Sequence, residues 1–302
     1  MLYKSTACRQ RTYKQEQSDR QEATVTFISY AQNFEDVRLW RALKQVEQGF
    51  YIDVGANDPH HDSVTKAFYD HGWQGVNVEP MQDYHDALCQ QRPRDATVQC
   101  IASDQPGEMT FYAIPDTGLS TADPTIAQHH KNQGMDVRSL TVKARTLTSI
   151  CEQYAADRPI HFLKIDVEGH EESVLRGMDF SRFRPWIIVI ETPWERDHTW
   201  EPLVTDAGYQ AILFDGLNTW FLADEYMQLK PAFDIPPCNL DNFQLCKGHA
   251  FAHPIIASEV DTAQQLANAL QRAEQAEAQL AALQNSRTLK AVQTLRNVLR
   301  RA

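Results

Sequence analysis

The chain has 302 residues, 42% of them hydrophobic, which is enough to bury the core of one large domain with appendages. Its net charge of −11 argues against nucleic acid as a partner, because phosphate contacts require an excess of Lys and Arg. The six cysteines include no C-x-x-C pair, so they indicate the reduced thiols of a cytoplasmic protein rather than a zinc site or a disulfide framework.

Three segments follow one another along the chain. Residues 1–23 are polar without periodicity and predict a disordered arm. Residues 24–257 alternate apolar runs with amphipathic stretches, which predicts an α/β domain with a mostly parallel sheet. Residues 258–302 lack Gly and Pro and predict a helical tail that can form a coiled coil. No apolar run approaches the about 18 residues of a membrane span, and the first residues lack an apolar signal region.

Within the domain, strands are expected where apolar and β-branched residues run together. These runs lie at 24–29, 51–54, 76–79, 98–102, 109–114, 140–144, 160–167 and 186–191, before an antiparallel edge hairpin at 211–214 and 220–222. Helices are expected at 32–47, 62–69, 84–91, 147–154, 171–176 and 203–207. Residues 115–139 have little periodicity and predict a long loop, with Ser120, Thr121 and His129, that serves as a substrate lid.

Two neighbouring strands end in acidic turns. Asp53 is followed by Gly55 and Asn57, and the next strand ends at Glu79. Carboxyl ends of parallel strands meet at the edge where such sheets bind ligands. No G-x-G-x-x-G follows the first strand, so no pyrophosphate cradle is indicated. Glu79 can accept hydrogen bonds from both hydroxyls of a ribose. A ligand with a ribose, cationic groups and no phosphate fits this pattern, and S-adenosylmethionine is such a ligand.

Three more expected strands close on acids, namely Asp166, Glu191 and Asp104. One acidic strand end is ordinary, since Asp is common in turns. We expect these five acidic strand ends to lie along one edge of one sheet, and such a group favours a functional site.

The run 163–171 crowds acids around a histidine. Asp166, Glu168 and His170 surround Gly169 just after a buried strand. Carboxylates beside an imidazole can orient it as a general base, and they can also hold a divalent cation through oxygen ligands. For Glu171 the competing interpretation, capping of the following helix, is favoured.

Five runs together resemble the FkbM family of S-adenosylmethionine-dependent methyltransferases. They are the runs at 29–36, 51–57, 62–65, 78–80 and, above all, 163–171. The resemblance covers roughly residues 24–250. It implies a Rossmann-like seven-stranded methyltransferase sheet and O-methylation, commonly of sugar or polyketide hydroxyls.

The resemblance also implies roles for single residues. Asp53, Gly55 and Asn57 would line the methionine end of the cofactor. Glu79 would bind the ribose, and Asp104 would lie beside the adenine. Many members of the family have a Gly soon after the Asn, where this chain has Asp58-Pro59-His60-His61, so His60 or His61 is a candidate to face the substrate.

The sulfonium methyl is already activated, so the enzyme has to align an acceptor oxygen and remove its proton. We expect His170, Asp166 and Glu168 to serve this step, with His170 as the base. Asp166 and Glu191 are the candidate ligands of a divalent cation. The acceptor is expected to be a carbohydrate or another hydroxyl-bearing molecule, and Trp194, His198 and Trp200 are candidates to pack on a sugar ring.

The last segment, 286–302, has five bases and no acids, with aliphatic residues on one helical face. Such a helix can lie on an anionic membrane surface, which would place the protein in the cytoplasm at the inner face of the membrane. The alternative is the basic end of a long helix that complements its own dipole. A coiled coil of the tail could also form a homo-oligomer. Two other classes of function remain open at this stage. One is a nucleotide-sugar or NAD-dependent oxidoreductase, which the missing glycine fingerprint disfavours. The other is a non-catalytic scaffold of a glycan-assembly complex, which the intact acids disfavour.

Overall fold

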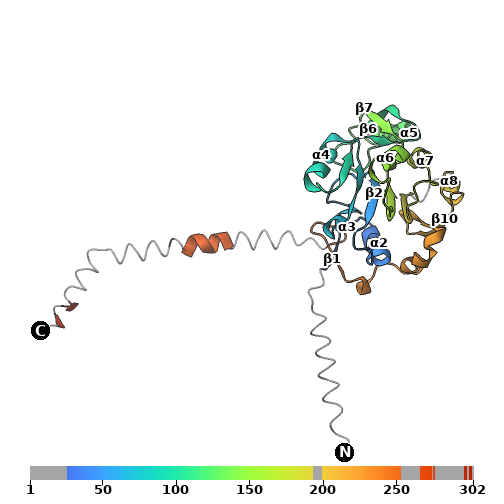
Figure 1. Cartoon of the computed structure of the whole chain (residues 1–302). Coiled ribbons are helices and arrows are strands. Elements are labelled where there is room, and N and C mark those ends of the chain that lie inside the picture. Colours follow the sequence, from blue (N-terminus) through green and yellow to red (C-terminus); the bar gives the residue numbers. More distant parts are fainter. Residues whose placement is uncertain are drawn as a thin grey trace, which may run out of the picture. The chain divides into compact units, whose positions relative to one another are not determined.

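The computed structural model describes residues 26–192, 199–252, 266–273, 275, 296–297 and 299–300. The chain divides into two units, Met1–Ala250 and Phe251–Ala302 (Figure 1). In the second unit, residues 266–273 are helical and exposed. The expected N-terminal arm, most of the expected tail helix, Trp194 and His198 lie outside the described residues. Within the described segments, none of the helices combines the length and apolarity needed to cross a bilayer.

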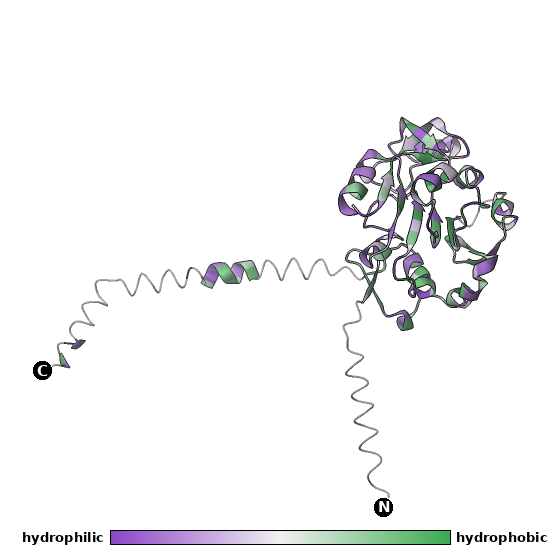
Figure 2. Cartoon of the chain, viewed as in Figure 1, coloured by the Kyte–Doolittle hydropathy of each residue, from purple (hydrophilic) through white to green (hydrophobic). Residues whose placement is uncertain are grey.

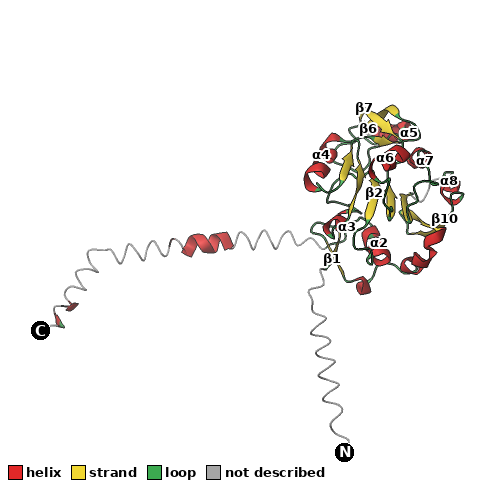
Figure 3. Ribbon diagram, in the orientation of Figure 1, coloured by secondary structure: helices red, strands yellow, loops and turns green. Residues whose placement is uncertain are grey.

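A seven-stranded sheet forms the centre of the first unit (Figure 3). Its strands lie in the order β10 (Tyr209–Phe214), β11 (Asn218–Ala223), β9 (Ile187–Glu191), β8 (Phe162–Ile165), β2 (Phe50–Val54), β3 (Gln74–Val78) and β4 (Ala96–Val98). Neighbours pair in parallel except at β11, which runs antiparallel to both β9 and β10. The predicted mostly parallel sheet with an antiparallel edge hairpin is thereby confirmed.

Helices cover both faces of this sheet. Buried residues of α6 (Leu147–Tyr154), α7 (Glu171–Arg176) and α8 (Glu201–Thr205) pack on one face, and those of α2 (Glu35–Leu43), α3 (Lys66–Asp70) and the 3-10 segment η1 (Asp224–Phe233) pack on the other. The described residues also form α4 (Gln82–Gln91), α5 (Pro124–Asn132) and the 3-10 turn η2 (Asn239–Asp241). The central strands are coloured mostly as hydrophobic and the outer helices carry hydrophilic stretches (Figure 2), as expected of strands that are buried on both faces.

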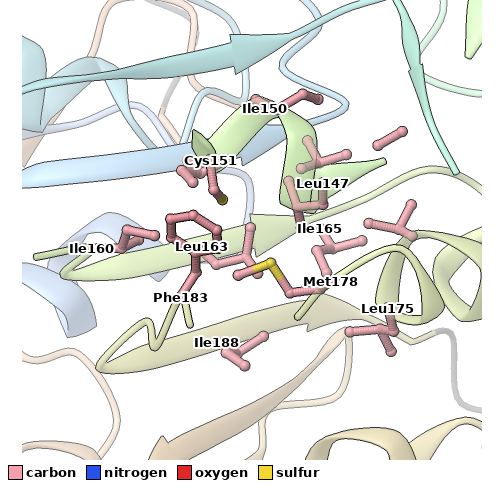
Figure 4. Packing of buried hydrophobic residues seen from close by; sticks show 14 of the residues in the cluster. Leu147, Ile150, Cys151, Ile160, Leu163, Ile165, Leu175, Met178, Phe183 and Ile188 are labelled. Carbon is pink, nitrogen blue, oxygen red and sulfur yellow. The ribbon is translucent and has the colours of Figure 1, made fainter. Parts of the chain in front are cut away.

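Alternate residues of β2 and β8 enter two separate cores. On one face, Leu163 and Ile165 pack with Leu147 and Ile150 of α6 and with Met178 after α7 (Figure 4). On the other face, a second set of buried residues includes Tyr51, Phe162, Leu39 of α2 and Phe68 of α3. Burial of both faces leaves the carboxyl edge of the sheet as the place where polar side chains can gather.

Two smaller sheets accompany the central one. β1 (Phe27–Ser29) pairs in parallel with β12 (Phe243–Leu245), a strand that the prolines at 231, 236 and 237 hide in the sequence. β5 (Ile101–Ala102), β7 (Arg138–Arg145) and β6 (Gly107–Ala113) form a three-stranded sheet.

Two further differences from the sequence prediction bear on the site. The expected single strand 98–102 divides between β4 and β5, so the acid that follows it does not lie on the edge of the central sheet. The expected loop 115–139 contains α5, because Asp123 caps its first turn by accepting from the backbone N–H groups of Thr125 and Ile126, and Pro124 suits the first helical position.

Candidate active site

A cavity of about 490 Å³ lies at the carboxyl ends of β2, β3, β8 and β9. Its volume falls within the range of about 300–1,000 Å³ that is usual for ligand pockets. The lining includes the sequence-predicted residues Asp53, Gly55, Asn57, Glu79, Asp166, Glu168, His170 and Glu191. Four strand ends that are far apart in the sequence therefore supply one site.

The turn after β2 is fixed by contacts that a side chain at residue 55 would break. Gly55 has φ +81, and a Cβ built there would lie 1.8 Å from the carbonyl oxygen of Asp166. Its N–H and that of Ala56 both donate to the Val78 carbonyl at the end of β3. The turn therefore lies pressed against the ends of two neighbouring strands, and only glycine fits.

Asp53 is 1% exposed and only partly hydrogen-bonded. Its Oδ2 accepts a hydrogen bond of 2.8 Å from the Thr65 hydroxyl, while Oδ1 has no hydrogen-bond partner among the described residues. The buried Oδ1 of Asn57 is likewise unpaired. Buried polar atoms normally have a hydrogen-bond partner, so these two acceptors at the cavity can receive hydrogen bonds from a ligand.

Glu79 is buried just after β3 and is held by the backbone. Its two carboxylate oxygens accept hydrogen bonds from the N–H groups of Asn57 (2.8 Å) and Met81 (2.7 Å). Burial raises the pKa of Glu79 to about 7, although these two hydrogen bonds oppose the shift. Each carboxylate oxygen retains a lone pair, so the group can still accept one more bond per oxygen.

Three carboxylates come together where β8 and β9 end. Oxygen atoms of Asp166, Glu168 and Glu191 all lie within 4.8 Å of one another. Burial, followed by the neighbouring Asp166 carboxylate, raises the pKa of Glu191 well above its usual range. Like charges this close favour either a shared proton or a bound cation. Oxygen ligands of this kind suit a hard divalent cation, so the three residues fit the predicted ligand set, with Glu168 added to it.

Lys164 already supplies one cation to this region, and the sequence prediction did not include it. Its Nζ lies 2.9 Å from Asp166 Oδ2, 3.8 Å from Asp53 Oδ1 and 3.5 Å from the Gly55 carbonyl oxygen. Burial alone would lower the pKa of this ammonium, but the adjacent carboxylates of Asp166 and Asp53 raise it overall. The charged lysine therefore joins the β2 turn to the β8 turn. Its position two residues before Asp166 on a strand was the available signal, since such residues share one face.

His170 directly precedes α7 and is one of the residues that line the cavity. The buried Nε2 has no hydrogen-bond partner among the described residues. Burial lowers the pKa of the imidazole, against the opposing effect of the Asp104 and Asp123 carboxylates. A neutral imidazole with an unpaired nitrogen can accept a proton at neutral pH.

The segment before α5 forms another wall of the cavity. Thr117 and Ser120 line it, whereas Thr121 is fully buried and donates from its hydroxyl to the carbonyl oxygen of Glu168 at 2.7 Å. This bond ties the wall to the acidic turn after β8. His129 is exposed on α5 and is not part of the lining. Of the lid residues expected from the sequence, only Ser120 therefore reaches the cavity surface.

Other predicted residues fall in different places. Asp104 is exposed, lies outside the cavity lining and accepts a hydrogen bond of 3.0 Å from Ser173 of α7, so the adenine role expected for it gains no support from its position.

His61 lines the cavity, whereas His60 packs edge-on against Tyr30. Trp200 is 6% exposed in the core and packs against Phe221. Glu171 lies in the first turn of α7 and accepts a hydrogen bond from the Gly169 N–H, which precedes the helix, so this bond is not the helix cap expected from the sequence.

Comparison with family models assigns the chain to one family. A family model described as the methyltransferase FkbM domain matches residues 53–211, which is more than half of the chain. The crystal structure of a TehB-like SAM-dependent methyltransferase from Corynebacterium glutamicum ATCC 13032 is similar with a TM-score of 0.34 and 11% sequence identity, over 72% of this chain and 99% of that chain. No curated protein sequence matches. Because the family model covers the strand ends that build the cavity, the chain belongs to the FkbM family and is an S-adenosylmethionine-dependent methyltransferase.

Proposed function

We propose that the chain transfers the methyl group of S-adenosylmethionine to a hydroxyl oxygen of a sugar or glycan. The observation that carries this proposal is the unpaired, buried Nε2 of His170 at the cavity. An alcohol is a poor nucleophile until its proton is removed, so a neutral imidazole beside the cofactor turn supplies what O-methylation needs.

The cofactor would occupy the part of the cavity beside β2 and β3. Asp53 Oδ1 and Asn57 Oδ1, which accept no hydrogen bond from the described residues, suit the α-ammonium of the methionine end. The remaining lone pairs of Glu79 suit the two ribose hydroxyls. Ile101 and Ala102 line the same cavity and are better placed than Asp104 to contact the adenine. The cofactor brings an activated methyl group, and the residues of this chain bind it and exclude water.

The acceptor would lie beside the acidic turn after β8. Asp166 and Glu168 would orient the reacting hydroxyl or, with Glu191, hold a divalent cation that lowers the pKa of that hydroxyl. The hydroxyls of Thr117 and Ser120 add polar groups that can bond to further hydroxyls of the acceptor. A lining rich in hydrogen-bonding groups favours a polyhydroxyl acceptor over an apolar one.

His170→Ala tests the assignment of the base. We expect turnover, measured as label transferred from S-adenosylmethionine to a panel of sugars, to fall by roughly 10²–10⁴. Affinity for S-adenosylhomocysteine, measured by calorimetry, should stay within about twofold. His129→Ala is the matched control, because His129 is exposed and outside the cavity lining. Normal turnover in His170→Ala, or loss of cofactor binding alone, would refute the role. If a chelator also abolishes wild-type turnover, a cation takes part in the reaction.

A further inference from the structure

Arg92 is a buried cation that lies outside the cavity lining. It follows the last turn of α4 and is 1% exposed. Within the described part of the chain, its guanidinium donates hydrogen bonds only to neutral oxygen atoms. Arginine is almost never fully buried without specific contacts, because removing a charge from water is costly. The partners of Arg92 therefore point to its role.

Two of these partners belong to one wall of the cavity. Nη2 of Arg92 donates to the carbonyl oxygen of Pro59 and, at 2.6 Å, to the hydroxyl of Ser63. Both acceptors lie in the segment between the β2 turn and α3, and Ser63 lines the cavity together with His61. One guanidinium therefore holds this wall from the side that faces away from the lining.

The third partner links Arg92 to the cofactor turn. Nη1 of Arg92 donates to the hydroxyl of Thr65 at 2.7 Å, and this hydroxyl donates to Asp53 Oδ2 at 2.8 Å. A guanidinium has donors and no acceptor, so the Thr65 oxygen has to accept from it. The single hydroxyl hydrogen is then left for Asp53. Arg92 thereby fixes the direction of both hydrogen bonds.

Thr65 makes these bonds instead of its usual local one. It is fully buried and occupies the N-cap of α3, where a threonine side chain commonly accepts from the backbone of the first helical turn. No such bond forms here. The hydroxyl therefore serves the Asp53 carboxylate rather than the start of the helix.

The relay decides which oxygen of Asp53 is left for a ligand. With Oδ2 engaged by Thr65, Oδ1 lies at the cavity, where the Lys164 ammonium is 3.8 Å away and no described residue donates a hydrogen bond. An acceptor whose orientation is fixed before the ligand arrives binds it more strongly, because less has to be ordered on binding.

We propose that Arg92 and Thr65 are positioning residues that orient Asp53 toward the α-ammonium of the cofactor. Neither residue lines the cavity, so both act through Asp53 and the wall that Arg92 holds. The proposal rests on the placement of the methionine end of the cofactor against Asp53 in the function proposed above.

Two ligands separate a positioning role from a purely structural one. S-adenosylhomocysteine has the α-ammonium, whereas 5′-methylthioadenosine has the same adenosine and sulfur without the amino-acid group. By calorimetry on the full chain, Thr65→Val should weaken S-adenosylhomocysteine by about tenfold and methylthioadenosine by less than about twofold. Thr65→Ser keeps the hydroxyl and should bind S-adenosylhomocysteine within about threefold of the wild type. Equal weakening of both ligands, or of neither, would overturn the proposal.

Thr97→Val is the matched control. It removes a buried hydroxyl that has no hydrogen-bond partner among the described residues and lies on β4, outside the lining, so it should change neither affinity. Asp53→Asn separates the proposal from its premise. Selective weakening in Asp53→Asn but not in Thr65→Val would leave the methionine end where it is placed and overturn the relay. Equal weakening of both ligands in Asp53→Asn would overturn the relay and that placement together.

A double-mutant cycle tests whether Arg92 acts through Thr65. Arg92→Lys keeps the charge but loses the fork that reaches several acceptors at once. It should lower the preference for S-adenosylhomocysteine over methylthioadenosine by about tenfold. In the Thr65→Val background it should lower that preference by less than about threefold more, because the relay is already broken. Independent effects, which would multiply to about 100-fold, would contradict the relay.

Discussion

The first unit contains two groups of buried carboxylates that differ in how completely they are hydrogen-bonded. Asp36, at the start of α2, is fully buried and accepts hydrogen bonds from the Ser29 hydroxyl and from the N–H groups of Tyr30, Ala31 and Val37. Asp53, at the end of β2, is equally buried but accepts one, from Thr65.

The difference separates acids that hold the fold from acids that await a ligand. Both residues lie in runs that resemble the FkbM family, and both are acidic and buried, so neither residue type nor burial distinguishes them. What distinguishes them is the number of hydrogen-bond donors that the protein places around each carboxylate. Asp36 fixes the chain between β1 and α2 with both oxygens hydrogen-bonded, whereas Asp53 Oδ1 lies at a cavity with no hydrogen bond from the described residues and only the Lys164 ammonium 3.8 Å away. A buried acid with an unpaired oxygen is the more informative sign of a binding site.

The largest effect should come from replacing the carboxylate of Asp36 or Asp53 with the neutral amide of asparagine. Asp36→Asn turns an NH₂ group toward donors, so it should lower the free energy of unfolding by about 3 kcal/mol. Asp53→Asn keeps an acceptor for Thr65 and leaves the closer ion pair of Lys164 with Asp166 intact, so it should lower the free energy of unfolding by only about 1 kcal/mol. The same substitution should weaken S-adenosylhomocysteine binding. Urea denaturation and calorimetry measure the two quantities. The comparison fails if the stability losses are equal or their order is reversed.

Glu79→Ala should weaken cofactor binding by at least about tenfold, because each hydrogen bond to a charged acceptor contributes about 1.5–3 kcal/mol. Glu79→Gln keeps the size of the side chain and one acceptor oxygen, so it should lose less. Calorimetry with S-adenosylhomocysteine gives both values, and circular dichroism shows that the variants are folded. Unchanged cofactor affinity in a folded Glu79→Ala variant would refute the assignment of Glu79 as the ribose-binding residue.

A rise in pH should lower the stability of the fold and raise its affinity for the cofactor. Burial raises the pKa of both Asp36 and Glu79 to about 7. A raised pKa in the folded state stabilises the fold at low pH, and this contribution is lost as the pH rises through about 7. The melting temperature of the ligand-free chain should therefore fall between pH 5 and pH 8, less steeply in Asp36→Asn. Cofactor affinity should rise severalfold over pH 6–8 as Glu79 ionises, and Glu79→Gln should flatten that rise.

The smallest effect on the site should come from removing the tail. Truncation after Ala257 should leave cofactor affinity unchanged, because every acid of both groups precedes residue 192. We propose that the tail serves placement or assembly, since lipid attraction contributes on the order of 1 kcal/mol per basic residue near an anionic surface. Sedimentation with anionic vesicles at low salt, or the oligomeric state, should change. Identical vesicle binding and size in both proteins would contradict that role.

Much of this arrangement followed from sequence pattern because strand ends have local signals. Apolar runs that stop at Asp53, Glu79, Asp166 and Glu191 predicted the central sheet and the edge that carries the cavity. The meeting of Asp166, Glu168 and Glu191 depends on a turn in which Glu168 has φ 49, and periodicity does not report such a backbone conformation.

Other features depended on contacts between distant parts of the chain. The sequence around residues 98–102 reads as one strand, but its two ends pair with different sheets, which removes Asp104 from the edge. Only the register between β2 and β8 places Lys164 beside Asp53.

The contact between Gly55 and the Asp166 carbonyl has a consequence for enzyme engineering. The two turns touch where a single methyl group would not fit, so neither can be reshaped while the other stays as it is. A chimera that takes the first half of the domain from one FkbM homologue and the second half from another would join turns selected separately. Exchange of both turns as one cassette should retain folding more often than exchange of either turn alone. Diversity for new acceptors is therefore better introduced at residues 116–120, away from this contact.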